Sequence, residues 1–163
     1  MSAAKLQPAL LGGAFIGILS ALPFVSAANV CCCLWIVAGG ALASWVMQQN
    51  HAGPVTAGDG AMVGFLAGVI GAFVYAVASA ALVPLLAPLR DARIESFLDG
   101  MPELPPEARE VAEWASTPGV SIMFGFLFHL FAGMVFATVG GTLGVLLFRR
   151  AAPPPPPPPL PSP

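Results

Sequence analysis

The sequence predicts an all-α integral membrane protein, a bundle of four transmembrane helices. The 163 residues are 57% hydrophobic and 9% charged, with a mean hydropathy of +0.85, whereas soluble domains carry about 25% charged residues. Four continuous apolar stretches contain no Asp, Glu, Lys or Arg, and each is long enough to cross a bilayer as a helix of roughly 17–25 residues. A transmembrane barrel would instead show alternating segments of about ten residues.

The four predicted helices cover approximately residues 6–25, 30–47, 61–87 and 120–148. The first two are joined by the short sequence "SAAN", which predicts an antiparallel hairpin. The second connection, "QQNHAGPVTAGDG" at 48–60, is a polar turn with glycine and proline as helix breakers. Asp59 is expected to cap the third helix by accepting hydrogen bonds from backbone N–H groups at its start.

The third connection, residues 88–118, is predicted to lie outside the membrane. Apolar residues recur there at helical spacing, on both sides of a Pro-Pro pair, which predicts two short amphipathic helices at the membrane surface. The segment either caps the bundle as a solvated cover or presents an acidic binding surface. Its acidic residues are Asp91, Glu95, Asp99, Glu103, Glu107, Glu110 and Glu113.

The last residues, 151–163, read "AAPPPPPPPLPSP" and are predicted to be a disordered tail in polyproline II conformation. Such a tail either docks into an aromatic groove on a partner or is a low-complexity end without one.

Glycines at four-residue spacing predict close helix packing. Gly60, Gly64 and Gly68 lie on one helix face, and Gly71 is expected to continue it. Since lipid provides no hydrophobic drive between helices, small residues that let backbones approach hold such bundles together. The contacts are made either within one chain or in a homo-oligomer. The predicted packing residues are Gly13, Gly17, Gly60, Gly64, Gly68, Gly71, Gly140 and Gly144.

An internal duplication is also indicated. The first and third apolar stretches align with Gly17 against Gly68, and the second and fourth align through their Gly-Gly pairs at 39–40 and 140–141. A duplication of this kind predicts two tandem helical hairpins of the same orientation, related by an axis along the membrane normal.

Cys31, Cys32 and Cys33 are consecutive, and the chain has no other cysteine. Because successive helical residues point about 100° apart, a regular helix cannot direct all three thiolates at one ion, and the spacing matches no structural zinc site. Two of them could hold Cu(I) from an irregular helix start, assisted by His129 or a methionine. The alternatives are an intermolecular disulfide, acylation, or packing as small apolar residues.

His129 is the one clearly ionisable side chain deep in a predicted helix. Ionisable residues inside the membrane are costly and often functional. The alternative is a structural role, in which a neutral imidazole donates a hydrogen bond to a backbone carbonyl. A b-type haem would need a second axial ligand at similar depth, and His51 is expected in a loop.

Most other functions are excluded or unsupported by the sequence. Six basic residues form no stripe for nucleic acid, and no catalytic motif or cofactor motif is present, so we expect neither an enzyme nor a cofactor. Two hypotheses follow. The protein is a non-enzymatic scaffold or assembly component in contact with the lipid bilayer and with a second copy or another membrane protein. Alternatively, it is a small transporter or metal-handling protein that uses Cys31–Cys33 and His129.

Basic residues near the ends favour both termini in the cytoplasm and a location in the cell inner membrane. Lys5 and Arg149–Arg150 support this orientation, while the arginines of residues 88–118 oppose it. An even number of helices places both termini on the same side. The first stretch also resembles a cleavable signal ending in "VSA", but its apolar run of about 20 residues exceeds the usual 7–15, which favours a retained helix.

The sequence "NVCCCLW" followed by "GDGAMVGFLAGVIGA" resembles small bacterial multi-pass membrane proteins of unknown function. The resemblance covers about the first half of the chain. It implies a membrane-embedded helical protein, and it implies no activity, ligand or catalytic residue.

Overall fold

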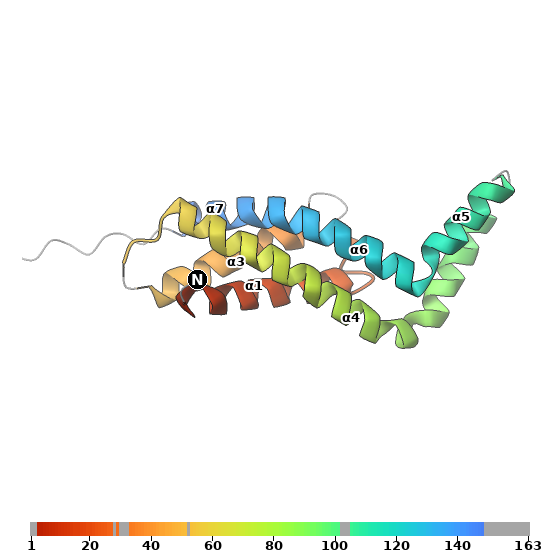
Figure 1. The fold of residues 1–163 in the computed structure, drawn as a ribbon, viewed down its shortest axis with the longest axis horizontal. Coiled ribbons are helices and arrows are strands. Elements are labelled where there is room, and N and C mark those ends of the chain that lie inside the picture. Colours follow the sequence, from red (N-terminus) through yellow and green to blue (C-terminus); the bar gives the residue numbers. More distant parts are fainter. Residues whose placement is uncertain (1–2, 28, 30–32, 52, 102–104, 149–163) are drawn as a thin grey trace, which may run out of the picture.

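The structure, a computed structural model, describes residues 3–27, 29, 33–51, 53–101 and 105–148, and these form helices joined by turns, without a strand. The elements in chain order are α1 (Ala3–Ala21), α3 (Leu34–Asn50), α4 (Ala57–Asp99), α5 (Pro106–Ser116), α6 (Pro118–Ala132), the π-helix η1 (Gly133–Ala137) and α7 (Thr138–Leu147) (Figure 1). The last three follow one another without a break and form one rod.

Four long rods pack side by side along most of the molecule (Figure 1). α1 and α4 run in the same direction, and α3 and the α6–η1–α7 rod run in the opposite direction. α4 is central, because it contacts α1, α3 and all three parts of the rod. This arrangement has the orientation that two tandem hairpins require, while the duplication itself stays a prediction.

Two helices of the described chain are long and apolar enough to cross a membrane, Ala57–Phe97 and Pro118–Leu147. Four such helices were predicted, and the prediction is wrong for the first two, which are too short. α1 contributes a shorter apolar helix, Lys5–Ala21, and ends four residues before the predicted position 25. α3 has 17 residues and begins at Leu34 rather than at 30. Pro23 follows the end of α1, and because it has no backbone N–H to donate it disfavours continuation of the helix.

The predicted boundary between the third helix and the surface segment is also wrong. α4 does not end at 87 but continues as one helix of 43 residues to Asp99, with Pro84 and Pro88 inside it. Each proline removes one helical hydrogen bond and crowds the preceding turn, and the helix bends in this region (Figure 1). Beyond the bend, α4 and α5 project from the bundle. We call residues 89–99 of α4 together with α5 the arm.

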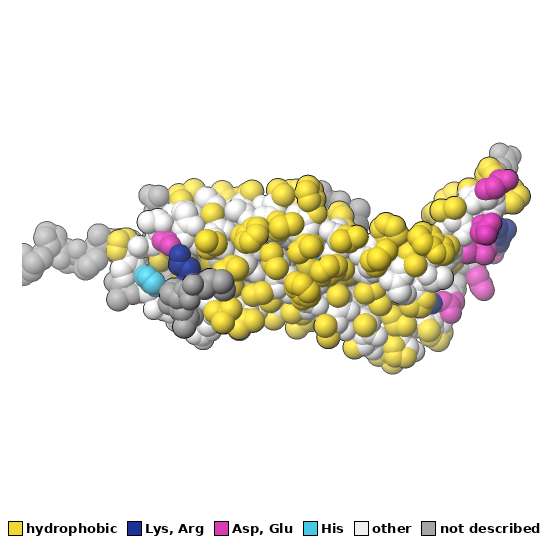
Figure 2. Space-filling view, in the orientation of Figure 1, with side chains coloured by type: hydrophobic (Ala, Val, Ile, Leu, Met, Phe, Trp, Pro, Cys, Tyr) yellow, Lys and Arg dark blue, Asp and Glu magenta, His cyan; other side chains and the backbone are white. Residues whose placement is uncertain are grey.

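The bundle is packed with small residues inside and large ones outside. The exterior carries phenylalanine and leucine side chains such as Phe73, 58% exposed, and Phe131, 70% exposed, and Figure 2 shows an apolar body with charged groups gathered near its ends. A surface of this kind suits hydrocarbon rather than water. Buried alanines dominate the interior: Ala9, Ala43, Ala67, Ala72, Ala132 and Ala137.

Candidate functional site

The contact between α4 and the α6–η1–α7 rod is made by glycines spaced four apart. A Cβ atom added at Gly60 would lie 2.5 Å from the carbonyl oxygen of Gly141. One added at Gly64 would collide with the carbonyl oxygen of Ala137, and one at Gly68 with that of Gly133. These three positions therefore admit only hydrogen, because the neighbouring atoms are backbone and cannot rotate away.

The contact between α1 and α4 uses a second set of glycines. An added Cβ at Gly13 would lie 2.6 Å from Cγ2 of Ile70, and one at Gly17 would lie 2.5 Å from Cβ of Val74. Gly71 faces Ile16 of α1, with 2.9 Å to its Cβ. The prediction that Gly71 continues the face of Gly68 is therefore wrong. Three residues turn a helix by about 300°, which is 60° short of a full turn, and this brings Gly71 toward a different neighbour.

The contact between α3 and the rod is reciprocal. Gly40 of α3 abuts the carbonyl of Ala137, and Gly140 of α7 abuts the carbonyl of Val37. The Ala137 carbonyl, at the end of the π-helix, is thus approached by Gly40 on one side and by Gly64 on the other. This oxygen marks the closest meeting of three helices.

Each of the eight predicted glycines contacts another helix of the same chain, and the structure adds glycines that the spacing rule missed. Two consecutive glycines present small surfaces to two neighbouring helices at once. The Gly-Gly pairs in the sequence could therefore have indicated most of these additional contacts. The additional contact residues are Gly12, Gly39, Gly40, Gly125, Gly133 and Gly141.

His129 lies on α6 and is 8% exposed. Its Nδ1 is 2.8 Å from the carbonyl oxygen of Gly125. Since a carbonyl can only accept, Nδ1 carries the proton and Nε2 has a free lone pair. The ring stacks on Tyr75 of α4, with 4.0 Å between ring centres. Nε2 is buried and has no hydrogen-bond partner among the described residues, so the site holds one unused acceptor in an apolar interior.

Cys33 immediately precedes α3 and is buried. Its φ of 49° and ψ of 38° place it in the left-handed region, which costs a non-glycine residue roughly 1–3 kcal/mol. Ala132, three residues after His129, belongs to the same buried cluster as Cys33. Cys31 and Cys32 lie outside the described residues. Within the described residues, no group of three His, Cys, Asp or Glu side chains could hold a metal ion.

The connection between α1 and α3 is held by polar contacts that the sequence analysis missed. The side-chain amide of Asn29 donates to Oγ of Ser20 at 2.8 Å, and its Oδ1 accepts from the backbone N–H of Trp35 at 3.0 Å. The indole Nε1 of Trp35 donates to the carbonyl of Val25 at 2.7 Å. The only indication of these contacts in the sequence is one polar residue between two apolar stretches, and such a residue is equally typical of an ordinary turn.

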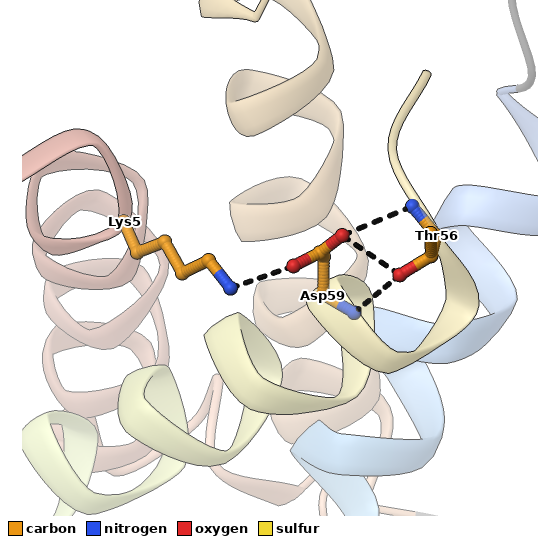
Figure 3. A network of polar contacts seen from close by, with 3 residues as sticks. All are labelled: Lys5, Thr56 and Asp59. Atoms are coloured by element: carbon orange, nitrogen blue, oxygen red, sulfur yellow. Dashed lines mark hydrogen bonds and ion pairs between the residues drawn. The ribbon is translucent and has the colours of Figure 1, made fainter. Parts of the chain in front are cut away.

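The opposite end of the bundle carries an ion pair between two helix starts (Figure 3). Nζ of Lys5 lies 2.6 Å from Oδ1 of Asp59. The other carboxylate oxygen of Asp59 accepts from Oγ1 of Thr56 at 2.7 Å and from its backbone N–H at 3.2 Å, and Oγ1 of Thr56 accepts from the N–H of Asp59 at 3.2 Å. This is a reciprocal cap at the start of α4, and Lys5 ties α1 to it. His51, just after α3, is exposed.

A family model described as the MJ1491 transmembrane domain matches residues 6–150, most of the chain. The chain belongs to the MJ1491 transmembrane domain family. No curated protein and no solved structure was found to match it. The resemblance to multi-pass membrane proteins thus holds at the level of a transmembrane domain, and the family description states a location in the membrane and no activity.

The match to the MJ1491 transmembrane domain covers the bundle and the arm alike. In the arm, α4 and α5 enclose a groove rich in carboxylates, with Arg109 paired to Glu113 at 3.5 Å. The arm also exposes Phe97, Val111 and Trp114, which are 57%, 62% and 55% exposed. The arm is therefore amphipathic, with acids and apolar groups on separate sides (Figure 2).

Proposed function

We propose that this MJ1491 transmembrane domain is a non-enzymatic membrane scaffold or assembly component, which anchors the arm at the membrane boundary for contact with another protein. The observation that carries the proposal is the continuity of α4 through the bundle and into the arm. A partner that binds the arm would be held at a fixed position relative to the bundle, because the same helix belongs to both.

The distribution of unused surface supports this proposal. The glycine faces are filled by contacts within the chain, so they offer no surface to a partner. Apolar side chains on the bundle face lipid, but Trp114 and Val111 belong to a helix rich in acidic residues that lies beyond the bundle. Exposed apolar groups beside charged ones are typical of protein contact sites. A helix with an apolar stripe binds partners through anchors at helical spacing.

Photocrosslinking in native membranes tests the scaffold proposal. The photoreactive residue p-benzoylphenylalanine replaces Phe97 or Trp114 in the arm, and Phe73 or Phe131 on the bundle surface as controls of similar exposure. We expect discrete protein adducts from the arm positions, and lipid adducts alone from the bundle positions. An arm that yields only lipid adducts, or the same protein adducts as the bundle, contradicts the proposal.

A second candidate function, metal handling, is favoured by a specific observation. Cys33 is buried with a left-handed backbone, His129 has a buried nitrogen without a partner among the described residues, and both side chains are soft or borderline metal ligands. The test is the metal content of protein purified under reducing conditions. A ratio near one metal per chain that is lost both on replacement of Cys31, Cys32 and Cys33 by alanine and in His129→Gln supports metal handling. Metal-free wild-type protein contradicts it.

A further inference from the structure

A groove of about 200 Å³ lies where α1 ends and α4 bends. α1 packs against α4 as far as the contact of Gly17 with Val74, and it ends at Ala21. From Ser79 onward, this face of α4 therefore loses its neighbour. Because α4 continues beyond that point, the uncovered face becomes one wall of a groove whose other wall is the end of α1.

The groove has an apolar part and a cationic part. Its α4 residues recur every three or four positions, which places them on one helix face. Apart from Ser79, the lining residues nearer the bundle are apolar, and the two last along α4 are arginines. The full lining is Ala21, Pro23, Ser79, Leu82, Val83, Leu86, Leu89, Arg90 and Arg93.

The acidic residues of the arm lie on the other side of α4. Asp91, Glu95 and Asp99 line the separate groove between α4 and α5. Arg90 forms one ion pair with its neighbour Asp91, with 3.1 Å between Nη2 and Oδ1. Arg93 has no carboxylate within ion-pair distance in the part of the chain that the structure describes. The apolar groove therefore carries net positive charge at one end, although the chain as a whole is acidic.

The position of the arginines along α4 matches the depth of a lipid headgroup. The Lys5–Asp59 ion pair marks one end of the bundle, and Arg90 lies 31 residues after Asp59. At 1.5 Å per residue this is about 46 Å of helix, close to the 40–45 Å thickness of a bilayer with both headgroup layers. With Asp59 at one membrane surface, Arg90 falls at the headgroup layer of the other, and Arg93 follows about one helical turn further along, after the bend at Pro84 and Pro88.

We propose that this groove binds one anionic phospholipid. The phosphate is held by the guanidinium groups of Arg93 and Arg90, since arginine pairs with phosphate through two parallel N–H···O bonds. One acyl chain lies along Leu82 and Leu86, toward the middle of the membrane. A soluble anion would use only the arginines, and a zwitterionic lipid would bring its own cation to a site that is already positive.

Native mass spectrometry of the full chain in mild detergent tests the proposal. Delipidated protein is titrated with dioleoylphosphatidylglycerol or with dioleoylphosphatidylcholine, and the first bound lipid is quantified. We expect the wild type to prefer the anionic lipid. The double variant Arg90→Gln/Arg93→Gln should lose this preference by roughly fivefold or more, since each basic residue near a membrane surface contributes about a fivefold factor toward anionic lipid.

Matched variants separate this site from general charge attraction. Arg109→Gln removes one positive charge from α5, away from the groove, and should leave the preference unchanged. Arg90→Lys/Arg93→Lys should keep part of it, because lysine retains the charge but cannot form the two parallel N–H···O bonds. Ser79→Phe, which narrows the apolar part, should weaken binding of the anionic lipid. Equal binding of the two lipids by the wild type overturns the proposal. So does an equal loss in Arg109→Gln, or displacement of the lipid by inorganic phosphate at concentrations comparable to those of the lipid.

Discussion

Replacing Gly64 by alanine should weaken the bundle although alanine is the better helix former. The added Cβ would collide with the carbonyl oxygen of Ala137 and lie 3.1 Å from Cα of Gly141. Both atoms are backbone, so the α6–η1–α7 rod must move away from α4. Overpacking of this kind costs about 1–3 kcal/mol, and the gain from helix propensity is at most about 1 kcal/mol.

Gly58 provides a matched control on the same helix. Its nearest neighbour would be Oγ1 of Thr56 at 3.8 Å from an added Cβ, an ordinary contact distance. Gly58→Ala therefore keeps the propensity gain without a collision and should be neutral or slightly stabilising. The free energy of unfolding of the two variants should differ by about 1–3 kcal/mol.

The measurement is unfolding of the purified protein in mixed micelles by a denaturing detergent, followed by far-UV circular dichroism. Gly64→Leu extends the series, because a larger side chain at the same point should prevent the native bundle from forming. If Gly64→Ala and Gly58→Ala have the same stability within about 0.5 kcal/mol, the backbone contact at Ala137 is not as close as the structure has it.

Other predictions concern the two ends of the bundle. Exchanging the ion pair in the variant Lys5→Asp/Asp59→Lys should restore part of the stability that either single change loses. The coupling energy should be at most about 1 kcal/mol, since both side chains are about one-third exposed. A double-mutant cycle without coupling contradicts the pairing. Asn29→Ala should cost about 1–3 kcal/mol by leaving the buried Ser20 hydroxyl and the Trp35 N–H without their partner, whereas exposed Asn50→Ala should cost little. Reporters fused before residue 1 and after residue 150 should both be active in the cytoplasm, and opposite locations would refute the bundle orientation.

The class of the protein and the location of its helices could be predicted from composition, because a scarcity of charge over long apolar stretches has few other physical solutions. Helix ends were less predictable. A proline inside an apolar stretch ends one helix and merely bends another: Pro23 follows the end of α1, while Pro84 and Pro88 lie within α4. The outcome depends on tertiary support for the neighbouring backbone groups, which local sequence does not contain.

The glycine contacts show the same limit. Four-residue spacing predicts which residues share a helix face, and Gly60, Gly64 and Gly68 do face one partner. The identity of that partner depends on the order of helices around the bundle, so Gly71 could not be assigned to α1 from spacing alone. Contacts made by single polar groups, such as the amide of Asn29, leave no periodic pattern at all.

His129 offers a test that separates the two candidate functions. Phenylalanine at this position can keep the stacking on Tyr75 and removes both ring nitrogens. It loses the hydrogen bond from Nδ1 to the Gly125 carbonyl, but it also removes the buried Nε2, which has no partner among the described residues. The Gly125 carbonyl lies inside α6, where it can still accept a backbone N–H. Because no buried partner is then left unsatisfied, His129→Phe should change the free energy of unfolding by less than about 1 kcal/mol.

His129→Ala is the matched comparison, because it removes the ring as well and should cost about 2–5 kcal/mol through the cavity it leaves. A stable His129→Phe variant that still gives the arm adducts at Trp114 agrees with a scaffold. A His129→Phe variant destabilised as much as His129→Ala would instead mean that a ring nitrogen contributes to stability, either through the Nδ1 hydrogen bond to Gly125 or through a species bound at Nε2. A metal ion bound by the imidazole would then be the first species to measure, because Nε2 is buried and has no partner among the described residues.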